Sequence, residues 1–229
     1  MPVIHDNELG KITIRRRTRS KHVTMRVAPA GSLRVAAPMY TPLFIMKRSI
    51  TASKRDLKEL LDRHRPVLQY SDGDQIGKSH SIMVREGLTT TVERDRLRII
   101  ATLAGGISIQ SPEVQALLRP EIINALKREA KGYLPKRLKY LADQHGFTYE
   151  RVRFSHASGR WGSCSSSGTI SLNIALMKLP FELIDYVLIH ELAHTMQMNH
   201  SDAFWKIVAE YSPRYKSHRS RLKREVPAI

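Results

Sequence analysis

Three histidines and one glutamate are gathered near the C-terminal end of the chain, at His190, Glu191, His194 and His200. Residues four apart lie on one face of a helix, so the rings of His190 and His194 can point at one ion. Glu191 can reach a water molecule beside that ion, and His200 follows far enough along for the chain to turn back. Three imidazole ligands leave one tetrahedral position open, as a catalytic zinc site requires. The spacing therefore predicts a Zn2+ centre with these histidines as ligands and Glu191 as the general base.

The helix that would carry the first two histidines is apolar around most of its circumference, which predicts that it is buried. Its apolar residues are Phe181, Leu183, Ile184, Val187, Leu188, Ile189, Leu192, Ala193 and Met196. Burying two histidines and a glutamate without partners is costly, and a metal ion supplies the missing partner. The alternative is an ordinary helix with two surface histidines, and the apolar context argues against it.

The chemistry expected from such a centre is hydrolysis, because a zinc ion lowers the pKa of bound water to about 7 and polarises a carbonyl or phosphoryl oxygen. This arrangement is most common in peptidases. Arg160 could steady a substrate carboxylate, phosphate or oxyanion, although a structural salt bridge is the simpler explanation. Trp161 is expected in the core, and Cys164 is expected to be a buried thiol rather than a fourth ligand.

The composition fits a folded globular chain of 229 residues, with 41% hydrophobic and 26% charged residues. Cys164 is the single cysteine, which excludes an intramolecular disulfide and favours a reducing, cytoplasmic location. The N-terminal residues form no apolar run, and no apolar stretch of membrane-spanning length occurs. Neither a signal peptide nor a membrane span is therefore expected.

The formal net charge of +17 belongs mainly to the two ends of the chain. Residues 1–70 hold 15 Lys and Arg against 5 Asp and Glu, and residues 206–229 hold 7 against 2. Around the expected metal site, residues 151–205 hold 4 of each. Basic ends favour polyanions such as nucleic acid, nucleotides or acidic proteins, although a merely soluble basic surface has the same composition. Residues 15–21 are almost entirely basic, as a phosphate-binding patch or the solvated face of strands would be.

Apolar alternation predicts strands within residues 11–37 and 80–103, with a turn at residues 29–32 and helices at about residues 42–50 and 53–64. No repeat period is visible. Gly105 and Gly106 break the chain, so we expect a strand-rich basic region at residues 1–105 and a catalytic region at residues 106–229.

The catalytic region is predicted to be α+β. Ser111 and Pro112 open a helix that should run to about residue 144, with a kink or break at Pro135. Short strands are expected at residues 151–155 and 169–172. The metal-site helix should begin at Pro180, and a further helix should follow His200.

Several runs of the sequence together resemble the YgjP-like metallopeptidase family, which is related to the SprT-like zincins. The runs are Arg160 to Cys164, Ile170 to Asn173, Asp185 to Val187, His190 to His194 and Asn199 to Trp205. The similarity covers roughly residues 15–225. It implies an α+β, zincin-like fold of the minimal gluzincin type, with a helical catalytic half, a short twisted sheet and a strand-rich N-terminal region. It also implies zinc ligands at His190, His194 and His200 and a general base at Glu191.

Three functions are compatible with these observations. The first is a zinc-dependent peptidase, whose basic ends could bring it to DNA-associated proteins. The second is a metal-dependent nucleotide pyrophosphohydrolase, since the same water can attack a phosphoryl centre, but no phosphate-cradling glycine motif supports it. The third is a nucleic-acid-binding protein with a structural metal, and an open three-histidine site beside a glutamate argues against it. The sequence does not identify the physiological substrate or the oligomeric state.

Overall fold

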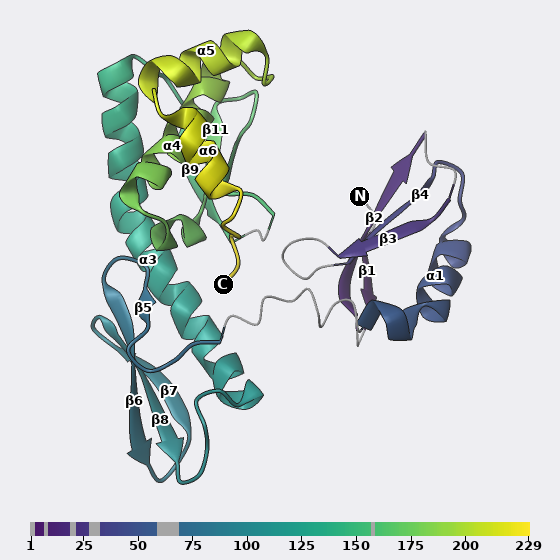
Figure 1. Ribbon diagram of the computed structural model, residues 1–229, viewed down its shortest axis with the longest axis vertical. Helices are drawn as coiled ribbons and strands as arrows, with labels where there is room; N and C mark the ends of the chain where they lie inside the picture. Colours follow the sequence, from purple (N-terminus) through teal and green to yellow (C-terminus); the bar gives the residue numbers. More distant parts are fainter. Residues whose placement is uncertain (1–2, 7–8, 19–21, 28–32, 59–68, 157–158) are drawn as a thin grey trace. The chain divides into compact units, whose positions relative to one another are not determined.

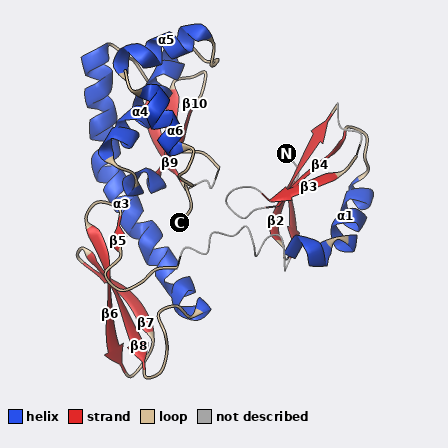
Figure 2. Cartoon of the chain, viewed as in Figure 1, coloured by secondary structure: helices blue, strands red, loops and turns tan. Residues whose placement is uncertain are grey.

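The chain forms two compact units in a computed structural model, Met1–Val67 and Leu68–Ile229. The structure describes residues 3–6, 9–18, 22–27, 33–58, 69–156 and 159–229 (Figure 1). The expected turn at residues 29–32 and the end of the helix expected at residues 53–64 lie outside these ranges. Helices and strands are both abundant (Figure 2), so the predicted α+β class is confirmed.

The first unit is a four-stranded sheet with a helix packed on one face. Its elements are β1 (Val3–Asp6), β2 (Gly10–Arg17), β3 (Thr24–Val27), β4 (Leu33–Pro38) and α1 (Leu43–Ala52). The strand order is β1-β2-β4-β3, with β2 and β4 parallel and the outer pairs antiparallel. Ile12 and Ile14 alternate with polar residues, and they form a core with Val35 of β4 and with Met46 and Ile50 of α1. The period-two pattern of the sequence thus places one face of this sheet in the core.

The second unit begins with a sheet of the same topology. Its strands are β5 (Gln75–Ile76), β6 (His80–Gly87), β7 (Thr91–Asp95) and β8 (Arg98–Ala104). Their order is β5-β6-β8-β7, again with a central parallel pair and antiparallel outer pairs. Each sheet is followed along the chain by a helix. The chain therefore contains a repeated fold element that no period in its sequence indicates.

The long helix α3 (Pro112–His145) joins this second sheet to the rest of the unit (Figure 1). Ser111 caps its start by accepting a hydrogen bond from the backbone of Val114, and Gly146 ends it in the left-handed conformation at φ 72°. The expected end at residues 144–146 is confirmed. The helix is continuous through Pro120 and Pro135, so the break allowed for at Pro135 does not occur.

The division expected at Gly105 and Gly106 falls inside the second unit rather than between the two units. The reason is packing over a long sequence distance: Ile82 and Ile99 of the second sheet share one core with Leu118 and Ile122 of α3. The glycine pair forms a turn between β8 and α3 and does not separate two cores.

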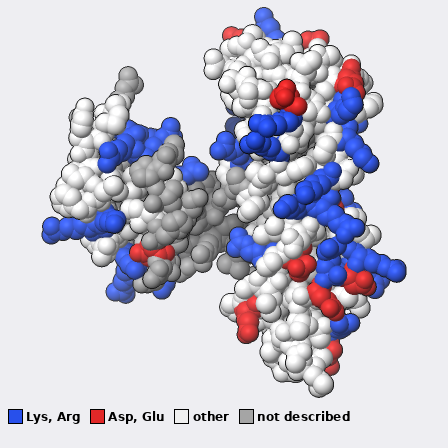
Figure 3. Space-filling view, turned by 180° about the vertical axis from the view of Figure 1, so that it is seen from behind, with Lys and Arg blue, Asp and Glu red and all other residues white. Residues whose placement is uncertain are grey.

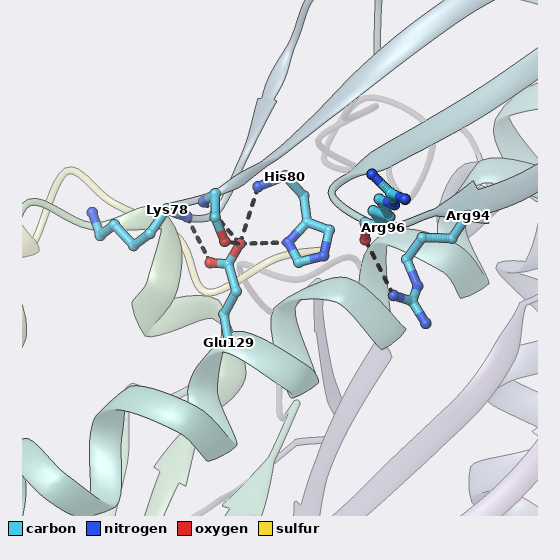
Figure 4. A network of polar contacts seen from close by, with 6 residues as sticks. Lys78, His80, Arg94, Arg96 and Glu129 are labelled. Carbon is cyan, nitrogen blue, oxygen red and sulfur yellow. Dashed lines mark hydrogen bonds and ion pairs between the residues drawn. The ribbon is translucent and has the colours of Figure 1, made fainter.

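Glu129 of α3 fastens the turn between β5 and β6 to the helix (Figure 4). Its carboxylate accepts hydrogen bonds from the backbone N–H groups of Lys78 (2.6 Å), Ser79 (2.9 Å) and His80 (3.2 Å), and it contacts His80 Nδ1 at 2.6 Å. Burial opposes ionisation, but the hydrogen bonds from His80, Lys78 and Ser79 outweigh it and lower the pKa of Glu129. Gly77 has φ +65°, and a Cβ there would overlap Glu129, so this turn requires glycine.

A small third sheet and four helices complete the second unit. They are β9 (Arg151–Ser155), β10 (Gly162–Cys164), β11 (Thr169–Asn173), the 3-10 helix η1 (Ile174–Lys178), α4 (Phe181–Met196), α5 (Asp202–Tyr211) and α6 (Tyr215–Leu222). The strand order is β10-β11-β9, so β10 is an edge strand that pairs antiparallel with β11. No described helix combines the length and the apolar character needed to cross a membrane.

Candidate metal centre

The helix α4 is the buried scaffold of the centre. Pro180 precedes it, and its Leu188, Leu192 and Ala193 are fully buried in the core of the second unit. Glu191 and His194 are also buried, at 5% and 8% exposure. The expectation that an apolar helix carries the polar motif into the interior is therefore confirmed.

The structure brings His190, His194 and His200 together at one point. Their ligand nitrogen atoms all lie within 4.8 Å of one another, and no other His, Cys, Asp or Glu joins this group among the described residues. The Nε2 atoms of His190 and His200 are 3.1 Å apart. Cys164 lies outside the group, and its thiol, which the sequence predicted to be buried, is only half-buried, with a contact to the carbonyl of Ser165.

The third histidine is positioned by α5, which follows it directly. The Phe204 ring is fully buried and stacks on His194 with a centroid distance of 4.5 Å, while Trp205 stacks on His200 at 5.7 Å. On α4, His194 Nδ1 lies 3.2 Å from the carbonyl oxygen of Gln197. A proton on Nδ1 donated to that oxygen leaves Nε2 free to bind a metal ion.

The electrostatic environment favours the neutral imidazoles of His190 and His194, and the neutral form is the one that binds metal. Burial, together with the nearby His194 and His200, lowers the pKa of His190 to about 3. Burial also lowers the pKa of His194 and outweighs the opposing effect of its hydrogen bond with Gln197. The chemistry of three converging imidazole donors fits a divalent transition metal such as zinc.

Glu191 is held against the backbone of β10. A Cβ built on Gly162 would lie 2.6 Å from Glu191 Oε1, so only glycine leaves room for this carboxyl group. Glu191 Oε2 is buried without a hydrogen-bond partner among the described residues. Burial raises the pKa of Glu191 to about 8, against the opposing charge of Arg160. A cation among the histidines would favour the ionised carboxylate.

Gly162 is a position beside the centre that the sequence pattern did not single out. It lies in the short strand β10. A glycine inside a strand often marks a close approach of another group to the backbone.

Arg160 lies beside the centre without being part of it. Its side chain is exposed, and its charge acts on Glu191. Its carbonyl oxygen accepts a hydrogen bond from Asn173 Nδ2 at 2.9 Å, which holds the chain just before β10. The alternative of a structural salt bridge finds no support in the described residues, where no ion pair of Arg160 occurs. Trp161 packs against the core of the unit while remaining partly exposed.

Three depressions that share lining residues lie beside the histidines. One is lined by Trp161, Tyr186 and Leu222 and shares Gly162, His190 and Glu191 with the second. The second is lined by the three histidines and by β10, and it shares His194 and Met198 with the third. The third is lined by residues 148–150 and 165–168. We refer to these depressions together as the groove along β10.

The chain belongs to the YgjP-like metallopeptidase family, whose metallopeptidase domain matches residues 21–225. The resemblance noted in the sequence is thereby confirmed. The chain is also similar to the solved structure of the metallopeptidase zymogen abylysin of Pyrococcus abyssi, with 32% identity over 38% of this chain and 90% of that chain and a TM-score of 0.36. Among curated proteins, none matches the sequence.

Proposed function

We propose that the protein is a zinc-dependent peptidase in which His190, His194 and His200 hold the metal and Glu191 is the general base. Membership of a metallopeptidase family supports a peptide substrate, and the cluster of three imidazole nitrogens supports a bound metal ion. Three protein ligands leave a coordination position open, which distinguishes a catalytic from a structural zinc site.

The residues of the chain divide the reaction between them. A bound Zn2+ ion supplies Lewis acidity and acidifies a water molecule in the site. Glu191 accepts a proton from the attacking water and returns it to the amine that leaves. Gly162 allows the carboxyl group to lie against β10, and the packing of Phe204 and Trp205 orients the second and third ligands.

The observation that carries the peptide assignment is the groove along β10. An edge strand presents unpaired backbone N–H and C=O groups, which can pair with an extended peptide. A peptide bound in this way would pass directly over Glu191 and the three histidines, with Arg160 near one end. A nucleotide would use neither the length of the groove nor the backbone of the strand, so we favour the peptidase over a pyrophosphohydrolase.

The test is turnover of two substrate classes by zinc-loaded protein. We expect cleavage of an unfolded protein such as casein and no release of pyrophosphate from nucleoside triphosphates. Glu191→Gln should keep the metal and lose activity, and His190→Ala should lose both. Full turnover by Glu191→Gln would show that the assigned base is wrong, and release of pyrophosphate that depends on Glu191 would replace the peptidase with the nucleotide hydrolase.

A further inference from the structure

The sheet of the first unit has one face that α1 leaves uncovered. Side chains on a strand alternate between faces, and Ile12, Ile14, Leu33 and Val35 occupy the face that packs on α1. The opposite face carries four exposed arginines, Arg15 and Arg17 on β2, Arg26 on β3 and Arg34 on β4. We call these four residues the arginine face.

The arginines are close together. Arg26 lies directly opposite Arg34 in the antiparallel pair of β3 and β4, and like charges in this position destabilise a sheet. Among the described residues, none of the four arginine side chains forms an ion pair or a hydrogen bond. The carboxylate of Asp6 in the same unit is paired with Lys54 at 3.4 Å. Figure 3 shows Lys and Arg spread over the first unit on the face in view, with little Asp or Glu among them.

The second sheet has the same topology, but its outer face carries charges of both signs. Where β3 and β4 oppose two arginines, β7 and β8 oppose Asp95 and Arg98. Arg85 of β6 pairs with Glu93 of β7 at 2.9 Å. The outer face of the second sheet is therefore balanced in charge, and the strand order does not itself demand an arginine face.

We propose that the arginine face binds the phosphodiester backbone of single-stranded nucleic acid. Guanidinium groups match phosphate oxygens with two parallel hydrogen bonds. The register places Thr13 opposite Arg34, so the arginines run diagonally across the sheet over about four residues, or ~13 Å at the strand rise. A polymer with regularly repeated anionic groups fits such a row better than a single small anion does.

An exposed tyrosine at one end of the row favours a single strand. Arg17 is paired in register with Pro38, and Tyr40 follows two residues later in the turn after β4, so it lies near the Arg17 end of the row. The Tyr40 side chain is 94% exposed. Unpaired bases stack on aromatic rings of this kind, whereas the bases of a duplex are already stacked. This inference is independent of the proposed peptidase activity.

The test is binding of a fluorescent 20-nucleotide oligo(dT) to the full-length protein, measured by anisotropy at a series of salt concentrations. If four phosphates are neutralised, the logarithm of affinity should fall with a slope of about −2.8 against the logarithm of salt concentration. Arg26→Gln combined with Arg34→Gln should make this slope shallower by about 1.4 and weaken binding at least tenfold at low salt. Tyr40→Ala should weaken binding about tenfold and leave the slope unchanged.

The matched control is Lys47→Gln combined with Arg48→Gln, which removes the same charge from exposed positions of α1 on the other side of the sheet. This variant should bind within about twofold of wild type. Thermal unfolding should show that both double variants are folded. Arg26→Gln with Arg34→Gln relieves a repulsion between facing charges, and Lys47→Gln with Arg48→Gln changes exposed residues only. Equal losses in both double variants would reduce the effect to diffuse charge and overturn the proposal. It would also be overturned by tighter binding to poly-glutamate, to anionic vesicles or to a 20-base-pair duplex than to oligo(dT).

Discussion

The two four-stranded sheets of this chain share one topology and differ in what their helices do. In the first unit, α1 has 10 residues and packs within the unit, so the sheet and its helix close their own core. In the second unit, α3 has 34 residues, and its buried side chains continue from the sheet into the core that carries the metal centre. The short helix thus closes the core of its own unit, whereas the long helix extends the core of its sheet to the metal centre.

The outer faces of the two sheets also differ in the balance of their charges. The second sheet balances its charges, as a supporting element needs only to be solvated. The first sheet concentrates arginines, and among the described residues their side chains have no ion-pair partner. We interpret the first unit as a recruitment element and the second sheet as a support for α3.

Equivalent core residues in the two sheets should have different consequences for the metal centre. Ile12→Ala in β2 and Ile82→Ala in β6 each leave a cavity in a buried position and should each cost about 2–5 kcal/mol of unfolding free energy in their own unit. Only Ile82→Ala should lower the temperature at which zinc is released, because only the second sheet shares a core with α4. Calorimetry combined with a zinc-sensitive dye would measure both. Equal zinc release in the two variants would contradict the separation of the units.

Gly162 should be required for activity but not for folding or metal binding. Gly162→Ala places a Cβ 2.6 Å from Glu191 Oε1 and should displace that carboxyl group. Misplacing a catalytic group by about 1 Å can reduce turnover about 100-fold. The control is Gly132→Ala in α3, which meets nothing within 4 Å and should leave turnover unchanged. Casein cleavage and zinc content should be measured for both variants. Unchanged turnover in Gly162→Ala would show that Gly162 is not required to position Glu191.

Glu129 should stabilise the second unit and have no effect on the stability of the first unit. Glu129→Ala leaves the backbone N–H groups of Lys78, Ser79 and His80 without their acceptor, at an expected cost of about 1–3 kcal/mol. Chemical denaturation should show this loss in the transition of the second unit alone. A loss shared equally by both transitions would mean that the units unfold together.

The same carboxylate should make the stability of the second unit depend on pH. The pKa of Glu129 is lowered in the folded protein from its ordinary value of 4.5, so its stabilising contribution is fully present above that pH. The contribution is lost as the pH falls below 4.5 toward the folded pKa, since the unfolded chain then binds the proton more readily. Denaturation of wild type and Glu129→Gln between pH 3 and pH 7 should show the two curves converging at the acid end. A difference that grows as the pH falls would contradict the lowered pKa.

The sequence predicted that the three histidines converge, because their pattern is local. The spacing of His190 and His194 is fixed by one helix, and the apolar residues around them indicate that the helix is buried. The position of His200 is less tightly fixed by the sequence pattern, but its short distance from His194 along the chain limits where its ring can lie. The basic run from Arg15 was recognised, but only the pairing of β2 with β4 shows that alternate arginines share a face with Arg34.

Features that depend on packing between distant segments were predicted less well. The glycine pair at 105 and 106 looked like a boundary because breakers often separate regions, whereas the apolar residues of β6 and β8 pack on α3 across the turn. The repeated sheet topology leaves no period in the sequence, since different side chains satisfy the same alternation. The close approach of Gly162 to Glu191 joins a strand to a helix, and no local pattern reports it.

The most direct test of the metal centre is X-ray absorption at the zinc edge of the zinc-loaded protein. We expect three histidine nitrogens at about 2.0–2.1 Å from the zinc ion and one further oxygen ligand, and we expect one nitrogen to be lost in His200→Ala. A sulfur ligand at about 2.3 Å, as Cys164 would supply, would mean a closed structural site and would contradict the assignment of this centre as catalytic.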